Sequence, residues 1–156
     1  MNDYYKNLPK KRMGAGALIF NEQDELLILK PNYKDHWSIP GGTVDENESP
    51  IQCCLREIKE EIGLELAEIK FLCIDYNSAS QEKSESLQFI FLCGNLTADL
   101  IAKIKVQQDE IDEFKFVKVE EALPLLNDKL RKRIQGCLKS IKSKKAVYLE
   151  NGKKIL

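Results

Sequence analysis

The chain has 156 residues, of which 43% are hydrophobic and 31% are charged, and its formal net charge is −1. A chain of this length can bury the core of one ordinary globular domain. The near-zero charge produces no overall field that would favour nucleic acid or an acidic membrane surface. No run approaches the ~20 apolar residues that a bilayer-spanning helix needs, so no membrane partner is expected.

The N-terminal segment and the cysteines indicate in which cellular compartment the protein is expected. Residues 1–12 are not followed by the apolar run of a signal peptide, because GAGALIF continues directly into the polar NEQDE. The five cysteines are odd in number and lack a CxxC spacing, so we expect reduced thiols at Cys53, Cys54, Cys73, Cys93 and Cys137. Both features favour a cytoplasmic protein.

The first half of the chain predicts two strands, a glycine turn and a helix. Residues 13–20 and 25–30 are strand-like and are joined by the polar turn NEQD. Pro40-Gly41-Gly42 predicts a turn that brings backbone close to a ligand. Helix signals follow over 49–62, where Ser49 is a good N-cap, Pro50 suits the first turn and Gln52 completes a capping box. Gly63 supplies the C-terminal cap.

This helix carries three glutamates on one arc. Glu57, Glu60 and Glu61 are separated by helical spacing, whereas the apolar stripe Ile51, Leu55, Ile58 and Ile62 lies on the opposite side. Like charges at this spacing repel, and a hard divalent cation such as Mg²⁺ would relieve the repulsion. A solvated acidic face is the alternative for such a run taken alone. The glycine turn in front of it favours the metal site.

Glu48 and Arg56 stand at either end of the same segment. Glu48 precedes the N-cap, and Arg56 is expected to reach back to it across two turns. We therefore interpret Arg56 as the residue that orients the acidic cluster. Binding of a substrate phosphate is the alternative role for an arginine at this position.

The second half predicts a further strand pair and a long helix. Residues 68–76 and 86–93 are strand-like and are separated by a polar loop, and FKFV at 114–117 predicts another strand. Helical spacing of apolar residues follows from Leu130 to Ile141. In the tail, 145–156, Asn151-Gly152 predicts a small hairpin, with a loose tail as the alternative. The element order indicates one α/β domain over 1–156, with a core of about 13–140 and helices packed on a mixed central sheet.

Residues 42–64 resemble, position for position, the signature of the Nudix hydrolases. The matching positions are Gly42, Glu48, Arg56, Glu57, Ile58, Glu60, Glu61, Gly63 and Leu64, with no departure from the pattern. The resemblance extends to GAGALIF, ELLILK and WSIPGG, and covers most of residues 13–140. It implies the α/β/α sandwich of the Nudix fold.

The resemblance also implies a reaction and its ligands. Nudix enzymes cut the pyrophosphate bond of a nucleoside diphosphate linked to another group, with Mg²⁺ or Mn²⁺. It implies that Glu57, Glu60, Glu61 and the backbone carbonyl of Gly41 bind the metal. Either Glu57 or Glu110 is expected to be the general base. Glu110 lies in an acidic loop where Asp109, Asp112 and Glu113 compete for the same role, and a solvated loop is the alternative for each.

The sequence specifies the substrate and the partners less closely than it specifies the reaction. Trp37, Tyr33 and Phe89 are candidates for contacting the nucleoside, although packing is the favoured role for Trp37. Nucleoside triphosphates, including oxidised ones, and nucleotide sugars such as ADP-ribose rank above dinucleoside polyphosphates and RNA 5′ ends. Residues 129–145 hold eight Lys or Arg and no acidic residue. We interpret them as a solvated helix face rather than a site for polyphosphate or RNA, so nucleic acid is not the expected partner.

Two further questions stay open. One is whether the chain pairs with a second copy as a homodimer, which no sequence feature demands. The other is whether the protein is a nucleotide-sensing module of Nudix fold that does not cleave its ligand. An intact carboxylate trio favours the enzyme, because a module without catalysis has no need to keep it.

Overall fold

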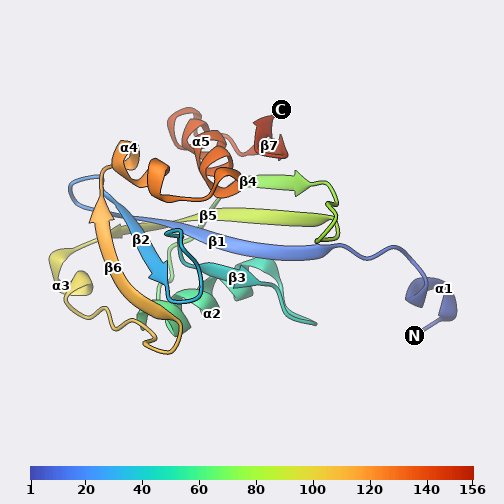
Figure 1. Cartoon of the computed structure of the whole chain (residues 1–156), viewed down its shortest axis with the longest axis horizontal. Coiled ribbons are helices and arrows are strands. Elements are labelled where there is room, and N and C mark those ends of the chain that lie inside the picture. The colour runs from blue at the N-terminus through green and yellow to red at the C-terminus, as the bar shows by residue number, and fades with distance from the viewer.

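The computed structural model describes all 156 residues and contains one mixed sheet with helices on both faces (Figure 1). The elements in chain order are α1 (Asp3–Lys6), β1 (Arg12–Asn21), β2 (Leu26–Pro31), β3 (Gly41–Thr43), α2 (Pro50–Ile62), β4 (Lys70–Asn77), β5 (Ser86–Leu96), α3 (Ala98–Ile101), β6 (Ile111–Val117), α4 (Val119–Ala122), the 3₁₀ turn η1 (Leu123–Leu125), α5 (Asp128–Ser143), β7 (Val147–Glu150) and β8 (Lys153–Lys154). No helix is long and apolar enough to cross a membrane.

The strand order is β6-β2-β1-β5-β4-β7-β8, and the short β3 pairs with β1. β1 runs parallel to β5 and β4 runs parallel to β7, whereas the other pairs are antiparallel. The apolar run in β1 is buried on both faces of the sheet. Leu18 belongs to the core under α5, with Ile134, and Ile19 belongs to the core over α2, with Ile58. The predicted sandwich of helices around a mixed sheet is therefore confirmed.

The helix α2 has the predicted caps but a shifted buried face. Ser49 and Gln52 form the capping box, and Gly63 takes the left-handed conformation with φ 74°. Ile58 and Ile62 are buried as expected, but Ile51 is 46% exposed. Cys53 and Cys54 are buried in its place, because the first turn of α2 packs its small side chains against the sheet.

The cysteines are not all reduced. Cys73 of β4 and Cys137 of α5 form a disulfide, so the expectation of five reduced thiols is wrong for this pair. The other three are buried free thiols. Cys53 lies beside the carbonyl of Thr43, and burial raises the pKa of its thiol to about 12. A thiol in that state is a poor nucleophile and a poor target for oxidation.

The C-terminal tail forms the predicted hairpin and extends the sheet. Asn151 and Gly152 both have positive φ, 50° and 79°, as a tight hairpin turn requires. The turn docks on the end of β4, where the Gly152 amide donates to Asp75 Oδ1 over 2.9 Å. Arg133 Nε of α5 donates to the other oxygen of Asp75 over 2.8 Å. One fully buried carboxylate thus ties the hairpin, α5 and the sheet together.

Replacing Asp75 by Asn is expected to lower the free energy of unfolding by about 3 kcal/mol, because Arg133 would keep a mostly buried charge without its partner. The loss stays at the low end of such changes because Arg133 retains its bond to Asn77 Oδ1. Urea denaturation followed by circular dichroism measures it. Asp112→Asn, at an exposed position of β6 without an ion pair, is the matched control. Equal stability of the two variants would contradict the role given to Asp75.

Candidate active site

Two glycines of β3, the strand before α2, allow the glutamates of α2 to approach the sheet. Gly41 pairs with Gly16 of β1 and has φ 158°, and a Cβ there would collide with the backbone of Ala15. A Cβ on Gly42 would collide with the carboxylate of Glu57. The Gly41 amide donates to Glu61 Oε1 over 2.9 Å. Backbone and carboxylates therefore meet at β3. The predicted turn is reduced to a bend at Pro40, because Gly41 and Gly42 pair with β1 as a strand.

Arg56 binds the other acidic residues of this segment, next to β3 and outside the cleft. Its Nε donates to Glu48 Oε1 over 2.7 Å, and its Nη1 donates to Glu57 Oε1 over 3.0 Å and to Glu60 Oε2 over 3.2 Å. Hydrogen bonding from Arg56 lowers the pKa of Glu48 to about 2, and the same bond to Glu48 raises the pKa of Arg56. Arg56 does not line the cleft described below. This geometry favours the orienting role over direct contact with a phosphate.

The glutamates of α2 divide between two environments. Glu57 and Glu61 line a cleft, whereas Glu60 is half exposed beside Arg56 and does not line it. Glu61 is only 7% exposed and has no Lys or Arg partner. The helix wheel places Glu61 opposite the apolar stripe, and β3 at Gly41 covers that face, so Glu61 is buried there.

Burial and neighbouring charge disfavour two charged carboxylates here. Burial first, and then the charges of Glu57 and Glu110, raise the pKa of Glu61 to about 8. Burial also raises the pKa of Glu57, against the opposing bond from Arg56. In the absence of a cation, the pair therefore holds a proton near neutral pH.

This donor set fits a hard divalent cation. The side chains do not form a ready cluster of three His, Cys, Asp or Glu groups. The fit rests on chemistry: the cleft offers the oxygens of Glu57 and Glu61, both with raised pKa values, next to Gly41 of β3. A cation that keeps several waters needs only one or two protein carboxylates, which is how Mg²⁺ binds. The side chain of Glu60 would have to leave Arg56 and rotate toward the cleft to bind the same cation.

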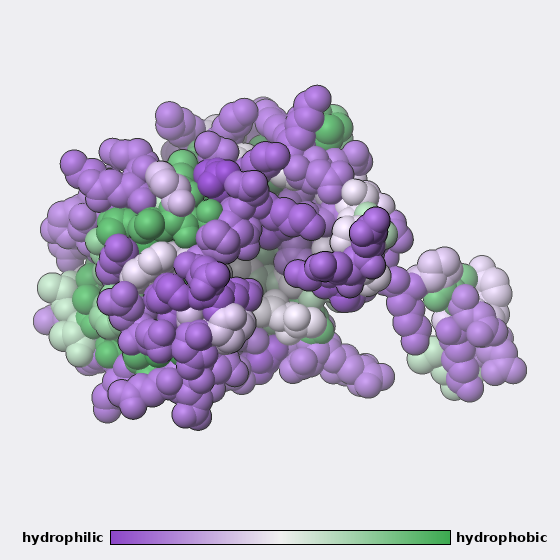
Figure 2. All heavy atoms as spheres, viewed as in Figure 1, coloured by the Kyte–Doolittle hydropathy of each residue, from purple (hydrophilic) through white to green (hydrophobic).

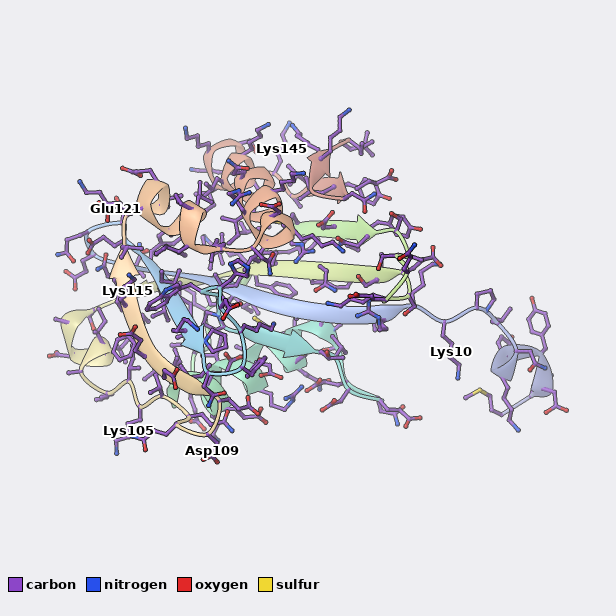
Figure 3. The ribbon with its side chains drawn as sticks, in the orientation of Figure 1. Lys10, Lys105, Asp109, Lys115, Glu121 and Lys145 are labelled. Atoms are coloured by element: carbon purple, nitrogen blue, oxygen red, sulfur yellow. A yellow bond between two sulfur atoms is a disulfide. The ribbon has the colours of Figure 1, made fainter.

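Glu110 is the acidic residue that reaches the cleft from outside the helix. It is held in the turn before β6 by a bond from the Asn32 amide to its carbonyl, 2.8 Å long. Glu110 lines the cleft, and Asp109, Asp112 and Glu113 do not. Figure 3 shows Asp109 at the outer tip of this loop. The charge of Glu110 contributes to the raised pKa of Glu61, so the two carboxylates share one electrostatic environment.

The cleft has a volume of about 1000 Å³ and opens on the face seen in Figure 2, where a hollow with a pale floor is rimmed by hydrophilic side chains. Strands β1 and β5 form the floor. One wall is formed by β3 and α2. The other is formed by α5 and the β4–β5 loop. The volume is that of a site for a ligand larger than one inorganic phosphate.

The three nucleoside-contact candidates are placed differently. Tyr33 lines the cleft beside Glu110 and Glu61, and burial followed by these charges raises the pKa of its phenol. Trp37 does not line the cleft: it packs against the core under α5, with Lys115 of β6 over its ring at 4.4 Å. Phe89 lies on the opposite face of the sheet, in the core over α2. The structure therefore places two of the three away from the cleft.

Sequence reasoning misses several polar residues of the cleft. Gln88 lies on its floor, with its side chain over Gly14. His36, the single histidine of the chain, also lines the cleft. Arg12 also lines the cleft, as do three of the eight basic residues in 129–145: Lys129, Arg131 and Arg133. The alternation of β5, with Gln88 and Ile90 between apolar residues of the other face, is the available signal for Gln88.

The family described as NUDIX domain matches residues 10–137. The mRNA-decapping enzyme subunit 2 of Saccharomyces cerevisiae is 32% identical over 124 residues, which are 77% of this chain but only 12% of the yeast protein. The chain thus spans a small part of that relative. An RNA pyrophosphohydrolase of Pelagibacter ubique is 27% identical over 141 residues, 82% of this chain and 89% of that protein.

Among solved structures, the MutT protein of Methanosarcina mazei Go1 superposes with a TM-score of 0.69 at 24% identity. The match covers 89% of this chain and 99% of that one, so the two share a fold. The family match spans most of the chain and includes β3, α2 and Glu110. These findings confirm the resemblance read from residues 42–64: the chain belongs to the NUDIX family, the Nudix hydrolases.

Proposed function

We propose that this protein hydrolyses the pyrophosphate bond of a nucleoside diphosphate linked to another group, with Mg²⁺ or Mn²⁺ as cofactor. The observation that carries the proposal is the arrangement of Glu57, Glu61 and Glu110 at one end of the cleft. Glu61 is buried there without a basic partner. A polyanionic pyrophosphate would be repelled by these carboxylates unless cations lay between them.

Each residue of the site then has a defined task. Glu57 and Glu61 would hold the metal, with the carbonyl of Gly41 as a further ligand. A divalent cation at this place would supply positive charge for the phosphates and would lower the pKa of water. Arg56 keeps the carboxylate of Glu57 in place through its 3.0 Å bond. Glu48 fixes Arg56 in turn, over 2.7 Å.

The proton of the attacking water needs an acceptor in the cleft. Glu57 and Glu110 both line it, and neither is fully enclosed, so water reaches both. We assign this role to Glu57, with Glu110 as the alternative base. The exposed setting of Glu110 favours easy exchange of the proton with solvent, whereas Glu57 is itself one of the proposed metal ligands and would stand beside a water held by the cation.

A panel of nucleotide pyrophosphates tests the reaction. Purified protein is incubated with ATP, 8-oxo-dGTP, ADP-ribose and diadenosine tetraphosphate, each with Mg²⁺ or Mn²⁺, and the nucleotide products are separated and measured by ion-exchange chromatography. Turnover that EDTA abolishes is the expected result. Binding of a nucleotide by calorimetry without turnover of any compound would favour the sensing module instead.

A further inference from the structure

The floor of the cleft is built from two parallel strands, β1 and β5. Gly16 of β1 pairs with Ile90 of β5, and Gly14 pairs with Gln88. Gly16 also pairs with Gly41, which places this first row at the metal end, the end of the cleft where the carboxylates of α2 lie. Gln88 lies two strands across and two residues along from Gly41, which corresponds to about 12 Å between their Cα atoms. A nucleoside whose 5′ phosphate is held at the metal end spans a comparable length.

The side chain of Gln88 lies directly over a glycine of the neighbouring strand. An added Cβ on Gly14 would collide with Oε1 of Gln88 and would lie 3.1 Å from its Nε2. The amide group therefore rests on the backbone of β1. A larger residue at position 14 would displace the amide, so the glycine determines where on the floor the amide lies.

The amide of Gln88 has no hydrogen-bond partner within the protein. No side-chain hydrogen bond of the structure involves it, and no buried side-chain polar atom lacks a partner, so the amide is open to the cleft. Asp75, which pairs with Gln88 across β4 and β5, is already occupied. Arg133 Nε donates to one of its oxygens over 2.8 Å, and the Gly152 amide donates to the other over 2.9 Å. The fold therefore does not use the donors and the acceptor of Gln88, and they are available to a ligand.

The floor between this amide and the metal end is apolar. An added Cβ on Gly16 would lie 3.1 Å from Cδ1 of Ile39 and 3.3 Å from Cδ1 of Ile90, so both side chains cover that glycine. Both isoleucines line the cleft. An apolar surface of this kind suits the face of a sugar or a base and not a charged phosphate. A ligand that follows the floor from the metal end therefore reaches Gln88 with an uncharged polar group.

We propose that Gln88 is a specificity-determining residue that hydrogen-bonds the edge of the substrate's nucleobase. A side-chain amide has one acceptor oxygen and two donor hydrogens, and the edge of a nucleobase presents donors and acceptors side by side. The two groups can therefore form a pair of hydrogen bonds. The assignment rests on the pyrophosphohydrolase function given above, and it adds the residue by which the site distinguishes a nucleotide from a pyrophosphate that lacks a base.

Binding in the absence of turnover is the first test. The ligands are the 5′-diphosphates of adenosine, guanosine, cytidine and uridine and the base-free ribose 5-diphosphate, all with a methylene group in place of the bridging oxygen so that they are not cleaved. Calorimetry with Mg²⁺ measures their affinities. Gln88→Met, with an apolar side chain of similar length, is expected to weaken binding of the preferred nucleotide by about tenfold, as the loss of two hydrogen bonds predicts, and to leave ribose 5-diphosphate unchanged. Gln23→Met, at an exposed position of the β1–β2 turn outside the cleft, is the matched control.

Glutamate at the same position tests for contact with the base itself. A carboxylate offers two acceptors, and among the four bases only guanine presents two N–H donors side by side on one edge. Gln88→Glu is therefore expected to raise the affinity for the guanine ligand, relative to the adenine ligand, by about tenfold over the ratio in the wild type. The added negative charge weakens binding of every diphosphate, so the ratio is the readout. A merely structural role of Gln88 would not change which base is preferred.

Gly14→Ala tests whether the position of the amide matters while the amide itself is kept. The new methyl group displaces the side chain of Gln88, and the preference for a nucleotide over ribose 5-diphosphate is expected to fall as far as it does in Gln88→Met. The double variant Gly14→Ala, Gln88→Met is expected to lose no more than either single variant, because both substitutions remove the same hydrogen bonds. Circular dichroism checks that each variant is folded. Additive losses would overturn the positioning of the amide by Gly14.

The binding results separate the role of Gln88 from the proposed reaction. Equal weakening of nucleotides and ribose 5-diphosphate in Gln88→Met would mean contact with the sugar or the phosphates and would overturn the assignment to the base. Unchanged binding of every ligand in that variant would also overturn it, as would a wild type that binds nucleotides no better than ribose 5-diphosphate. Base-selective binding that depends on Gln88, in a protein that turns over no compound of the substrate panel, would support the role of Gln88 and contradict the hydrolase function.

Discussion

Replacing Glu61 by Gln is expected to lower kcat by about 10²-fold to 10³-fold while the fold is retained. Glu61 is the most enclosed carboxylate of the site, and its Oε1 already accepts the Gly41 amide. The glutamine side chain can keep that hydrogen bond, but it brings no negative charge to a divalent cation. Steady-state hydrolysis of the best substrate of the panel, at saturating Mg²⁺, measures the loss.

The same substitution at the other two glutamates of α2 is expected to lower kcat to different extents. Glu57→Gln is expected to lose about as much as Glu61→Gln, since Glu57 lines the cleft and is assigned the proton transfer. Glu60→Gln is expected to lose less than about tenfold, because Glu60 is bound by Arg56 outside the cleft. Equal losses for all three would show that Glu60 turns into the site when metal binds. Wild-type turnover in the Glu57 and Glu61 variants would contradict the catalytic assignment.

The local part of the site is predictable because its determinants are contiguous in sequence. The caps of α2 and the reach of Arg56 to Glu48 depend on residues within 40–63. Helical spacing and capping are short-range rules, so the pattern specifies them without knowledge of the rest of the fold. The same holds for the hairpin at Asn151-Gly152, where both positions take positive φ.

The cleft itself depends on contacts between distant segments, and sequence patterns do not encode these directly. Gln88 and Phe89 alternate along β5, but which of them faces the cleft depends on where α2 and α5 pack. The aromatic ring of Phe89 makes it a candidate for the nucleoside, yet it lies on the other face of the sheet. Burial of Glu61 likewise depends on the pairing of Gly41 with Gly16 in β1.

The tail beyond the family match contributes to the cleft. The NUDIX match ends at residue 137, whereas the hairpin of β7 and β8 follows it. Gly152 of that hairpin binds the oxygen of Asp75 that Arg133 leaves free. A Cβ on Gly152 would lie 2.6 Å from Cβ of Lys132, so the hairpin packs directly on α5. The orientation of Arg133 therefore depends on a segment outside the shared domain.

Glu61→Gln is expected to stabilise the metal-free protein at pH 8 by roughly 3 kcal/mol, although it removes activity. The pKa of Glu61 is raised to about 8, mainly by burial, from 4.5. Below pH 4.5 the carboxyl is protonated in both the folded and the unfolded protein, and the contribution to stability is complete. Between pH 4.5 and 8 the unfolded chain releases the proton while the folded chain retains it, so the free energy of unfolding falls as pH rises. Glutamine has no carboxyl proton to lose, so the variant escapes this decrease in the free energy of unfolding.

Urea denaturation in EDTA at pH 5.5 and pH 8 measures the difference between the wild type and the variant. The gap should widen from pH 5.5 to pH 8, because only the wild type is forced to bury a charge. Addition of Mg²⁺ should reverse the order at pH 8, since the cation binds the charged carboxylate and stabilises only the folded wild type. Glu60→Gln, at a half-exposed position, is the control and should show neither effect. A Glu61 variant less stable than the wild type in EDTA at pH 8 would mean that the charged carboxylate stabilises the fold by itself. The burial of Glu61 would then not require a cation.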